Sequence, residues 1–200
     1  WNPNVAKITL LNETDQLIHV LVEDLKLSNV FEVSFIYGLY SICDKRALWR
    51  SLKSINNATL GNPWIVFRDF NEVLSPIEIF GGDQVWNPGM TDFNNCINDC
   101  CFSDLRYTGC YFTWSNKRIN REDFIERKID RALINNDWLD IFPNSHAIFQ
   151  PPGISDHSLI IVDMGQHSSR KGLPFKFYNY WSTLDNYDEI ITEAWNTQIE

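Results

Sequence analysis

Alternation of apolar and other side chains predicts a β-strand over residues 30–37. In this stretch, "VFEVSFIY", the residues Val33, Phe35 and Tyr37 stand at every second position, which is the period of a strand. The first residues of the chain, "WNPNVAKITLL", have the composition of a strand as well. Both stretches are therefore expected to belong to a sheet.

A helix is expected after residues 30–37. Asp44 can cap its N-terminus, and Leu48, Leu52 and Ile55 form one apolar stripe at helical spacing. The chain then passes through "GNP" into "WIVF", an unbroken apolar run that predicts a buried strand. The order strand, helix, buried strand is typical of a layered α/β fold.

The second half of the chain repeats this order. Thr91 is expected to cap a helix, and "YFTWS" and "SHAIFQ" are expected to be short strands. Ile125, Arg127 and Ile129 alternate with charged residues in "FIERKIDRALI", which predicts a strand with one solvent-facing side. "NDWLDIF" predicts a short helix that Pro143 ends, and "PPGISD" predicts a rigid loop before a last strand in "HSLIIVDM".

Composition changes after Gly165. "GQHSSRKGLP" is a polar connector, and "NYDEIITEAWNTQIE" predicts an amphipathic helix. We therefore expect one domain over residues 1–165, and a linker with a helix leading towards a following domain over residues 166–200. The chain begins at Trp1 and not at Met, so we also expect that residues upstream are missing.

Charge and cysteine content narrow the function classes. The formal net charge of -9 argues against a protein that holds nucleic acid by net charge alone, so a polyanionic substrate would need a local basic patch or a bound cation. The 5 cysteines are an odd number without paired CxxC spacing, which favours free thiols in a reducing compartment over a disulfide framework or a zinc site. No stretch has the length of a membrane span or the composition of a signal peptide, so we expect an intracellular protein, nuclear or cytoplasmic and not secreted.

Polar side chains follow the expected strands at their ends. Ligand sites in layered α/β folds gather there, because the loops beyond strand ends lie next to each other. Together such groups suit metal-assisted hydrolysis of a phosphate ester, with carboxylates for a hard cation and an imidazole as base or charge stabiliser. The residues are Tyr37, Asp69, Asn71, Asp130, Asp156 and His157.

Each of these signals also has a purely structural interpretation. Asp69 and Asn71 can form a turn after their strand, and Asp156 with His157 can be an ordinary loop pair. Asp130 stands between two basic residues and can be an exposed ion pair. Only the combination, in this order along the chain, favours chemistry.

Five motifs carry a resemblance to a known superfamily: "SFIYG", "PWIVFRDFNEVLSP", "GCYFTWSN", "RKIDRALINNDW" and "PPGISDHSLIIV". Together they resemble the endonuclease/exonuclease/phosphatase superfamily, and more closely the endonuclease domain of plant LINE-type, non-LTR retrotransposon polyproteins. The resemblance implies an α/β (α+β), DNase I-like layered sandwich, in which two mixed β-sheets pack together and helices flank them, with its first strands missing here. It also implies a DNA-nicking endonuclease that leaves a 3′-hydroxyl, with DNA as partner, no membrane, a monomeric state, and a reverse transcriptase domain linked in a longer polyprotein.

The resemblance assigns roles by matching position. Asp69 and Asn71 match the pair that contacts the attacking water and the phosphate, His157 matches the catalytic histidine, and Asp130 matches the carboxylate that orients it. The other implied roles are a phosphate contact by Tyr37, substrate contacts by Thr113, Trp114 and Asn116, and a place for Asp156 beside the metal. The implied cofactor is Mg²⁺ or Mn²⁺.

Two departures from the superfamily pattern leave activity uncertain. The asparagine and the metal-binding glutamate expected upstream of the first strand are absent, and Glu13 in "LNETD" only imitates the glutamate because it belongs to a strand connection. Arg68 replaces the glycine that normally precedes Asp69, and it adds bulk and a positive charge at a position where backbone freedom is useful. We therefore expect impaired catalysis.

Two other functions stay open. One is a phosphatase of the same superfamily, and the other is a catalytically dead remnant that binds nucleic acid. The second would use a group of basic side chains near Trp114, although mixed charges in the same stretch also fit a solvated hairpin. The basic residues are Lys117, Arg118, Arg121, Arg127, Lys128 and Arg131.

Overall fold

The computed structural model describes residues 1–165 except 27 and 60, together with 187, 192 and 195. The chain divides into two compact units, Trp1–Gln166 and His167–Glu200. The linker and helix expected over residues 166–200 fall almost entirely outside the described residues, as does His167. Among the described residues, no helix has both the length and the apolar character needed to cross a bilayer.

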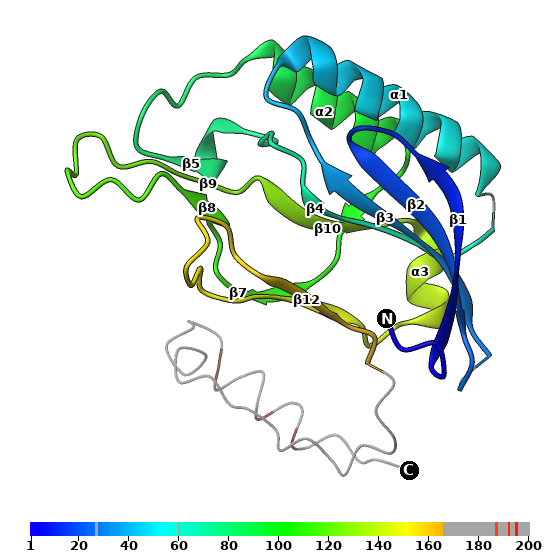
Figure 1. Cartoon of the computed structure of the whole chain (residues 1–200). Coiled ribbons are helices and arrows are strands. Elements are labelled where there is room, and N and C mark those ends of the chain that lie inside the picture. The colour runs from blue at the N-terminus through cyan, green and yellow to red at the C-terminus, as the bar shows by residue number, and fades with distance from the viewer. Residues whose placement is uncertain (27, 60, 166–186, 188–191, 193–194, 196–200) are drawn as a thin grey trace. The chain divides into compact units, whose positions relative to one another are not determined.

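A six-stranded mixed sheet forms the centre of the first unit (Figure 1). β1 and β2 form an antiparallel hairpin, β3 runs parallel to β4, and β10 pairs antiparallel with both β4 and β6. The strand order is β1-β2-β3-β4-β10-β6. The strands are β1 (Ala6–Glu13), β2 (Leu17–Asp24), β3 (Val30–Tyr37), β4 (Trp64–Asp69), β10 (Asp130–Ile134) and β6 (Ser103–Asp104).

β4 is buried on both faces, which explains its unbroken apolar run. Trp64 and Val66 pack into a core beneath the helices, whereas Ile65 and Phe67 pack into a second core on the other side of the sheet. Successive side chains of a strand point to opposite faces, so a strand covered on both sides needs apolar residues at every position. The prediction of a buried strand at "WIVF" is confirmed.

Two helices, α1 (Ile42–Ala58) and α2 (Pro88–Asp99), lie side by side over one face of the sheet (Figure 1). Trp49 of α1 stacks on Phe93 of α2 with ring centroids 4.8 Å apart, and both rings are buried. The crossover from β3 through α1 to β4 is the expected strand, helix, strand unit. This layer contains the apolar stripe predicted from Leu48, Leu52 and Ile55.

A second, three-stranded sheet and a short helix lie on the opposite face. β7 (Tyr107–Gly109) runs parallel to β11 (His146–Phe149), which pairs antiparallel with β12 (Ile160–Asp163). The helix α3 (Asn136–Ile141) contributes Trp138 to the core between the two sheets. A third small sheet has the order β5-β9-β8 and consists of β5 (Ile79–Phe80), β9 (Glu126–Arg127) and β8 (Trp114–Ser115), and the 3-10 turn η1 (Pro76–Glu78) precedes it.

Sheets packed together and flanked by helices confirm the predicted α/β (α+β) layered sandwich. Two predicted helix starts are wrong. Ser41 and not Asp44 is the N-cap of α1, and Asn87 and not Thr91 is the N-cap of α2, where its side chain accepts a hydrogen bond from the Met90 amide. The serine and the asparagine are also good caps, so local sequence did not distinguish the candidates.

The prediction of one strand with a solvent-facing side in "FIERKIDRALI" is also wrong. The segment forms two short strands, β9 and β10, and every residue of β10 is buried. Arg131 is fully buried because its guanidinium donates to the carboxylates of Glu78 and Asp104. Lys128 is buried as well, beside Asp104 and the ring of Tyr107. These two residues therefore belong to the interior and not to an exposed basic cluster.

Candidate active site

Three neighbouring strands bring the predicted site residues together at one edge of the main sheet. The parallel pairing of β3 with β4 places Tyr37 opposite Asp69. The antiparallel pairing of β10 with β4 places Asp130 opposite the same Asp69. Tyr37, Asp69 and Asp130, which are far apart in sequence, thus lie side by side on neighbouring strands, as the sequence predicted for polar residues at strand ends.

His157 reaches the site from the loop between β11 and β12. An isolated bridge joins it to Trp114, and the next amide, Ser158 N, donates to the Thr113 carbonyl at 2.7 Å. The backbone of β8 therefore fixes the height of the histidine above the sheet. The earlier part of the loop, which contains two prolines, restricts the approach of the chain.

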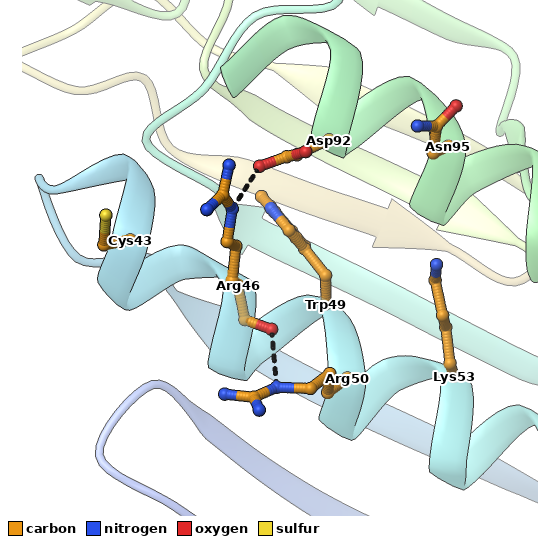
Figure 2. A pocket seen from close by; sticks show the side chains of 7 residues that line it. All are labelled: Cys43, Arg46, Trp49, Arg50, Lys53, Asp92 and Asn95. Atoms are coloured by element: carbon orange, nitrogen blue, oxygen red, sulfur yellow. Dashed lines mark hydrogen bonds and ion pairs between the residues drawn. The ribbon is translucent and has the colours of Figure 1, made fainter. Parts of the chain in front are cut away.

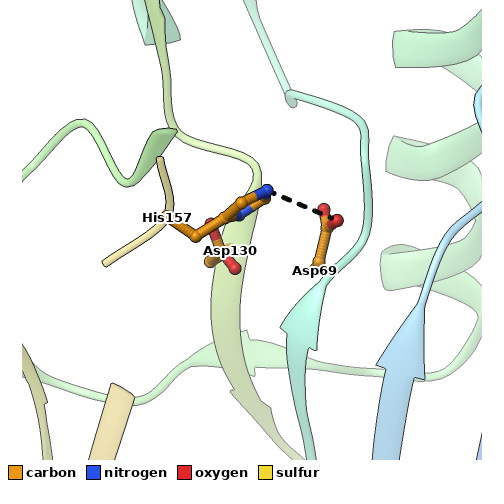
Figure 3. A group of neighbouring side chains, drawn as sticks. All are labelled: Asp69, Asp130 and His157. Atoms are coloured by element: carbon orange, nitrogen blue, oxygen red, sulfur yellow. Dashed lines mark hydrogen bonds and ion pairs between the residues drawn. The ribbon is translucent and has the colours of Figure 1, made fainter. Parts of the chain in front are cut away.

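The imidazole of His157 lies between two carboxylates (Figure 3). Its Nδ1 is 3.0 Å from Asp130 Oδ2, and its Nε2 is 4.0 Å from Asp69 Oδ2. Since a carboxylate accepts, Nδ1 carries the proton of the shorter contact. Asp130 is only 2% exposed and so holds the ring in one orientation.

The environment shifts the protonation of both partners. Burial, followed by the charge of Asp130, raises the pKa of Asp69 from 3.8 to about 6. The hydrogen bond that His157 donates to Asp130 raises the pKa of His157, and its effect outweighs the opposing effect of burial. A carboxylate that titrates near neutral pH beside an imidazole that stays protonated longer than usual is a pair suited to acid–base chemistry.

Asn71 turns back over the strand end. Its backbone φ is 50°, a left-handed conformation that asparagine tolerates, and its amide N donates to Asp69 Oδ1 at 2.8 Å. Its side-chain Nδ2 donates to the Gly38 carbonyl at 3.2 Å. Gly38 is required here, because a Cβ at this position would lie 2.4 Å from the Phe70 carbonyl oxygen. The "YG" and "DFN" motifs therefore support each other.

A buried ion pair beneath Asn71 was not predicted from the sequence. Lys45 of α1 donates to the Asn71 carbonyl at 2.7 Å and forms an ion pair with Glu72, and both charged residues are buried. A lysine on an otherwise polar helix face gave no sign of this role. The pair connects α1 to the loop that holds the carboxamide.

Arg68 has a backbone φ of 104°, a region that favours glycine. As expected, an arginine here occupies a position at which the backbone conformation favours glycine. The positive charge of Arg68 lowers the pKa of Asp69, as expected, but it is the smallest of the effects and burial outweighs it.

Of the remaining predicted residues, Trp114 and Asp156 line the pocket above the strand ends, whereas Thr113 and Asn116 do not. Trp114 Nε1 donates to Asp156 Oδ2 at 2.9 Å, and both side chains face the pocket. Thr113 is 1% exposed, and its Oγ1 accepts from the amides of Ile129 and Asp130 at 3.1 and 2.9 Å, so it lies below the site and fixes the backbone there. The side chain of Asn116 accepts from the Ile125 amide within the β8–β9 connection.

A pocket of about 370 Å³, here called the reaction pocket, opens over the strand ends. It collects most of the predicted residues and three that were not assigned to the site from the sequence: Tyr40, Arg127 and Ile129. No strong sequence signal marked Tyr40 or Ile129, whereas Arg127 was noted only for its charge. The predicted residues that line it are Tyr37, Asp69, Asn71, Trp114, Asp156 and His157.

The site has the donor atoms for a metal ion. Ligand atoms of Asp69, Asp130 and His157 all lie within 4.8 Å of one another, and they are the group of this kind in the described part of the chain. Carboxylate oxygens suit a hard divalent cation, and a cation would offset the cost of ionising the buried Asp69. The donor set therefore fits a metal. Asp156 is not in this group, and its carboxylate accepts a hydrogen bond from Trp114.

Comparisons with known proteins find similarity in structure only. No protein-family profile matches the sequence, and no curated protein does. The chain is similar to the endonuclease domain of TRAS1, a telomere-specific non-LTR retrotransposon, with a TM-score of 0.55 and 11% identity over 79% of this chain and 68% of that one. It is also similar to a functionally unknown conserved protein from Enterococcus faecalis, with a TM-score of 0.51 and 14% identity over 82% of this chain and 69% of that one.

A third similar structure is an endonuclease/exonuclease/phosphatase protein from Bacteroides vulgatus, with a TM-score of 0.47 and 15% identity over 74% of this chain and 54% of that one. At these identities the first two comparisons establish the fold and nothing more. That fold is the DNase I-like α/β sandwich that the five sequence motifs led us to expect.

Proposed function

We propose, from the DNase I-like fold of the chain and the pairing of His157 with Asp130, that the protein hydrolyses phosphodiester bonds in DNA. The observation that carries the proposal is the cluster of Asp69, Asp130 and His157, whose ligand atoms lie within 4.8 Å of each other. Asp69 and His157 line the reaction pocket, and the buried Asp130 lies behind them. Tyr37 and Asn71 line the same pocket and supply neutral donors for phosphate oxygens.

The positions of the side chains suggest their roles. Asp69 takes a proton from the attacking water, because it is the carboxylate whose pKa is raised to about 6. His157, whose pKa is raised by its hydrogen bond to Asp130, stabilises the negative charge that develops on the phosphate. Attack by water forms one P–O bond and breaks the bond to the 3′ oxygen, which takes a proton and leaves as a 3′-hydroxyl beside a 5′-phosphate.

We infer that a divalent cation, Mg²⁺ or Mn²⁺, binds at the free carboxylate oxygens of Asp69 and Asp130. When bound, such an ion polarises a phosphate oxygen and lowers the pKa of bound water. Asp156 is the predicted additional carboxylate near this position, and rotation of its side chain away from Trp114 would make it available.

DNA as substrate and the retrotransposon origin remain proposals. They are supported by the sequence motifs and by the similarity to a retrotransposon endonuclease domain in fold. A monomeric endonuclease domain within a longer polyprotein, followed by a reverse transcriptase, is the arrangement that the plant LINE resemblance implies. Activity is expected to be weak, because Arg68 holds a glycine conformation next to Asp69.

A substrate comparison tests the function. The chain is incubated with Mg²⁺ and supercoiled plasmid, or with a small phosphate monoester such as p-nitrophenyl phosphate. Slow nicking that EDTA abolishes, without turnover of the monoester, is the expected result. Turnover of the monoester without nicking would identify a phosphatase, and DNA binding without any cleavage would identify a binding module.

A further inference from the structure

A second pocket continues the reaction pocket along the protein surface. It has a volume of about 310 Å³, and we call it the flanking pocket. The two pockets share three lining residues, Asn71, Arg127 and Ile129, so they are contiguous at this point. A ligand larger than one phosphate group can therefore extend from one pocket into the other.

The flanking pocket combines an apolar floor with an exposed aromatic wall, and two carboxylates also line it: Glu72, which is paired with Lys45, and the exposed Asp83. Val73, Ile79 and Ile129 are buried beneath it as one apolar cluster. Trp86 and Val85 stand at its side and are 52% and 69% exposed, which is a large exposure for such side chains. The indole Nε1 of Trp86 donates to Thr91 Oγ1 at 2.9 Å, which fixes one edge of the ring and leaves its faces available.

Arg127 supplies a positive charge where the two pockets meet. It is exposed on β9, and no carboxylate pairs with it among the described residues. Its neighbours Lys128 and Arg131 are both neutralised in the interior, so Arg127 is the basic member of the "ERKIDR" run that faces the pockets. An unpaired guanidinium beside a phosphate site binds a second phosphate well.

We propose that the flanking pocket binds the nucleotide next to the scissile phosphate, with Arg127 on its phosphate and Trp86 stacked on its base. This inference rests on the proposed function and specifies its substrate as a polynucleotide strand that occupies both pockets. Aromatic stacking tolerates any base sequence, and one phosphate contact per arginine adds affinity that salt weakens. In a chain with a net charge of -9, such a local cation is what a polyanion requires.

Binding of a fluorescein-labelled 12-nucleotide single strand, measured by anisotropy in Ca²⁺ to prevent turnover, tests the inference without requiring activity. Arg127→Gln is expected to raise Kd about tenfold. It should also reduce the slope of log Kd against log salt concentration by the amount that one phosphate contact contributes. Trp86→Leu is expected to raise Kd about tenfold or more, whereas Trp86→Phe, which keeps an aromatic ring, should recover most of the affinity.

Arg50→Gln is the matched control for charge. Arg50 is exposed on α1 in a separate groove between α1 and α2, where its Nε donates to the Arg46 carbonyl (Figure 2). Its substitution removes the same charge and should leave Kd within twofold of the unsubstituted chain. Equal weakening by Arg127→Gln and Arg50→Gln would show binding by general charge and would overturn the inference.

Kinetics separate this inference from the proposed function. Bis(p-nitrophenyl) phosphate is a small phosphodiester, and the oligonucleotide fills both pockets. Arg127→Gln should lower the ratio of kcat/KM for the oligonucleotide to kcat/KM for the small diester at least fivefold. An unchanged ratio with intact cleavage would refute the flanking pocket alone, whereas absent cleavage with the expected binding changes would refute only the hydrolytic function. Hydrolysis of phospholipid vesicles without oligonucleotide binding would overturn the inference in favour of a lipid.

Discussion

His157 Nδ1 lies 3.0 Å from Asp130 Oδ2, and this contact joins a loop of the second sheet to strand β10 of the first. The carboxylate is buried, whereas the imidazole is partly exposed to the reaction pocket. Asp130 therefore holds the imidazole of His157 through Nδ1, and Nε2 of the same ring faces Asp69.

Removing the charge of Asp130 should lower the pKa of His157. In Asp130→Asn the hydrogen bond to a carboxylate, which is the largest cause of the raised pKa, is lost. The titration of the His157 ring followed by NMR should move to lower pH. Asp156→Asn is the control, because Asp156 is the weakest contributor to the same shift. Equal shifts in the two variants would contradict the assigned geometry.

Asp69→Asn should stabilise the fold at neutral pH and reduce activity. The pKa of Asp69 is raised from 3.8 to about 6, so the folded protein binds more protons than the unfolded chain between these values, and stability falls as pH rises through them. This difference corresponds to about 3 kcal/mol.

Urea unfolding in EDTA should therefore show Asp69→Asn more stable at pH 7.5 by about 2–3 kcal/mol and equal to the unsubstituted chain near pH 3.5. Asp140→Asn is the control, because Asp140 is an exposed carboxylate on α3. Its effect on the free energy of unfolding should change little with pH. If Asp69→Asn changed the free energy of unfolding by the same amount at all pH values, ionisation of Asp69 would not destabilise the fold, and the prediction would be wrong.

Arg68→Gly should relieve backbone strain. Arg68 holds a φ of 104°, and a residue with a Cβ in that region costs about 1 kcal/mol or more. The glycine variant should gain up to about 1 kcal/mol in the free energy of unfolding and should cleave DNA faster. Arg68→Ala removes the same charge but keeps the Cβ, so it should gain no stability. A larger gain in the alanine variant would assign the effect to charge.

Much of the fold could be predicted from local patterns. The alternation in residues 30–37 and the apolar run "WIVF" both formed strands. In β4 the unbroken run reflects burial on both faces, whereas in β3 the alternating Phe35 and Tyr37 are exposed and Ile36 between them is buried. The pairing of Tyr37, Asp69 and Asp130 was also expected, since strand ends meet at one edge. The motifs that resemble the superfamily pointed to the same residues.

Long-range partners explain what could not be predicted. Arg131 belongs to a run of charges that indicated a solvent-facing strand, yet it is buried by Glu78 and Asp104, which lie far away in sequence. The flanking pocket was missed for the same reason, because Trp86 and Arg127 are far apart in sequence and come to line one pocket only in the folded chain.

Breaking the buried ion pair of Arg131 should unfold the chain readily. Arg131→Met leaves the carboxylate of Glu78 buried without its cation and should cost about 3–5 kcal/mol in the free energy of unfolding. The double variant Glu78→Gln with Arg131→Met should recover a large part of this loss, because no isolated charge remains. Denaturant unfolding of the single and double variants measures the coupling energy between Glu78 and Arg131. If the losses in the free energy of unfolding of the two single variants simply added in the double variant, the prediction would be contradicted.

Plasmid nicking by His157→Ala measures the central claim most directly. Wild-type chain, His157→Ala and the control His146→Ala, which changes a histidine of β11 outside the pocket, are compared in Mg²⁺ at equal concentration. We predict that His146→Ala nicks at the wild-type rate and that His157→Ala is slower by about 100-fold or more. Nicking by His157→Ala at the wild-type rate, or its absence in the wild-type chain, would contradict a hydrolytic site at Asp69, Asp130 and His157.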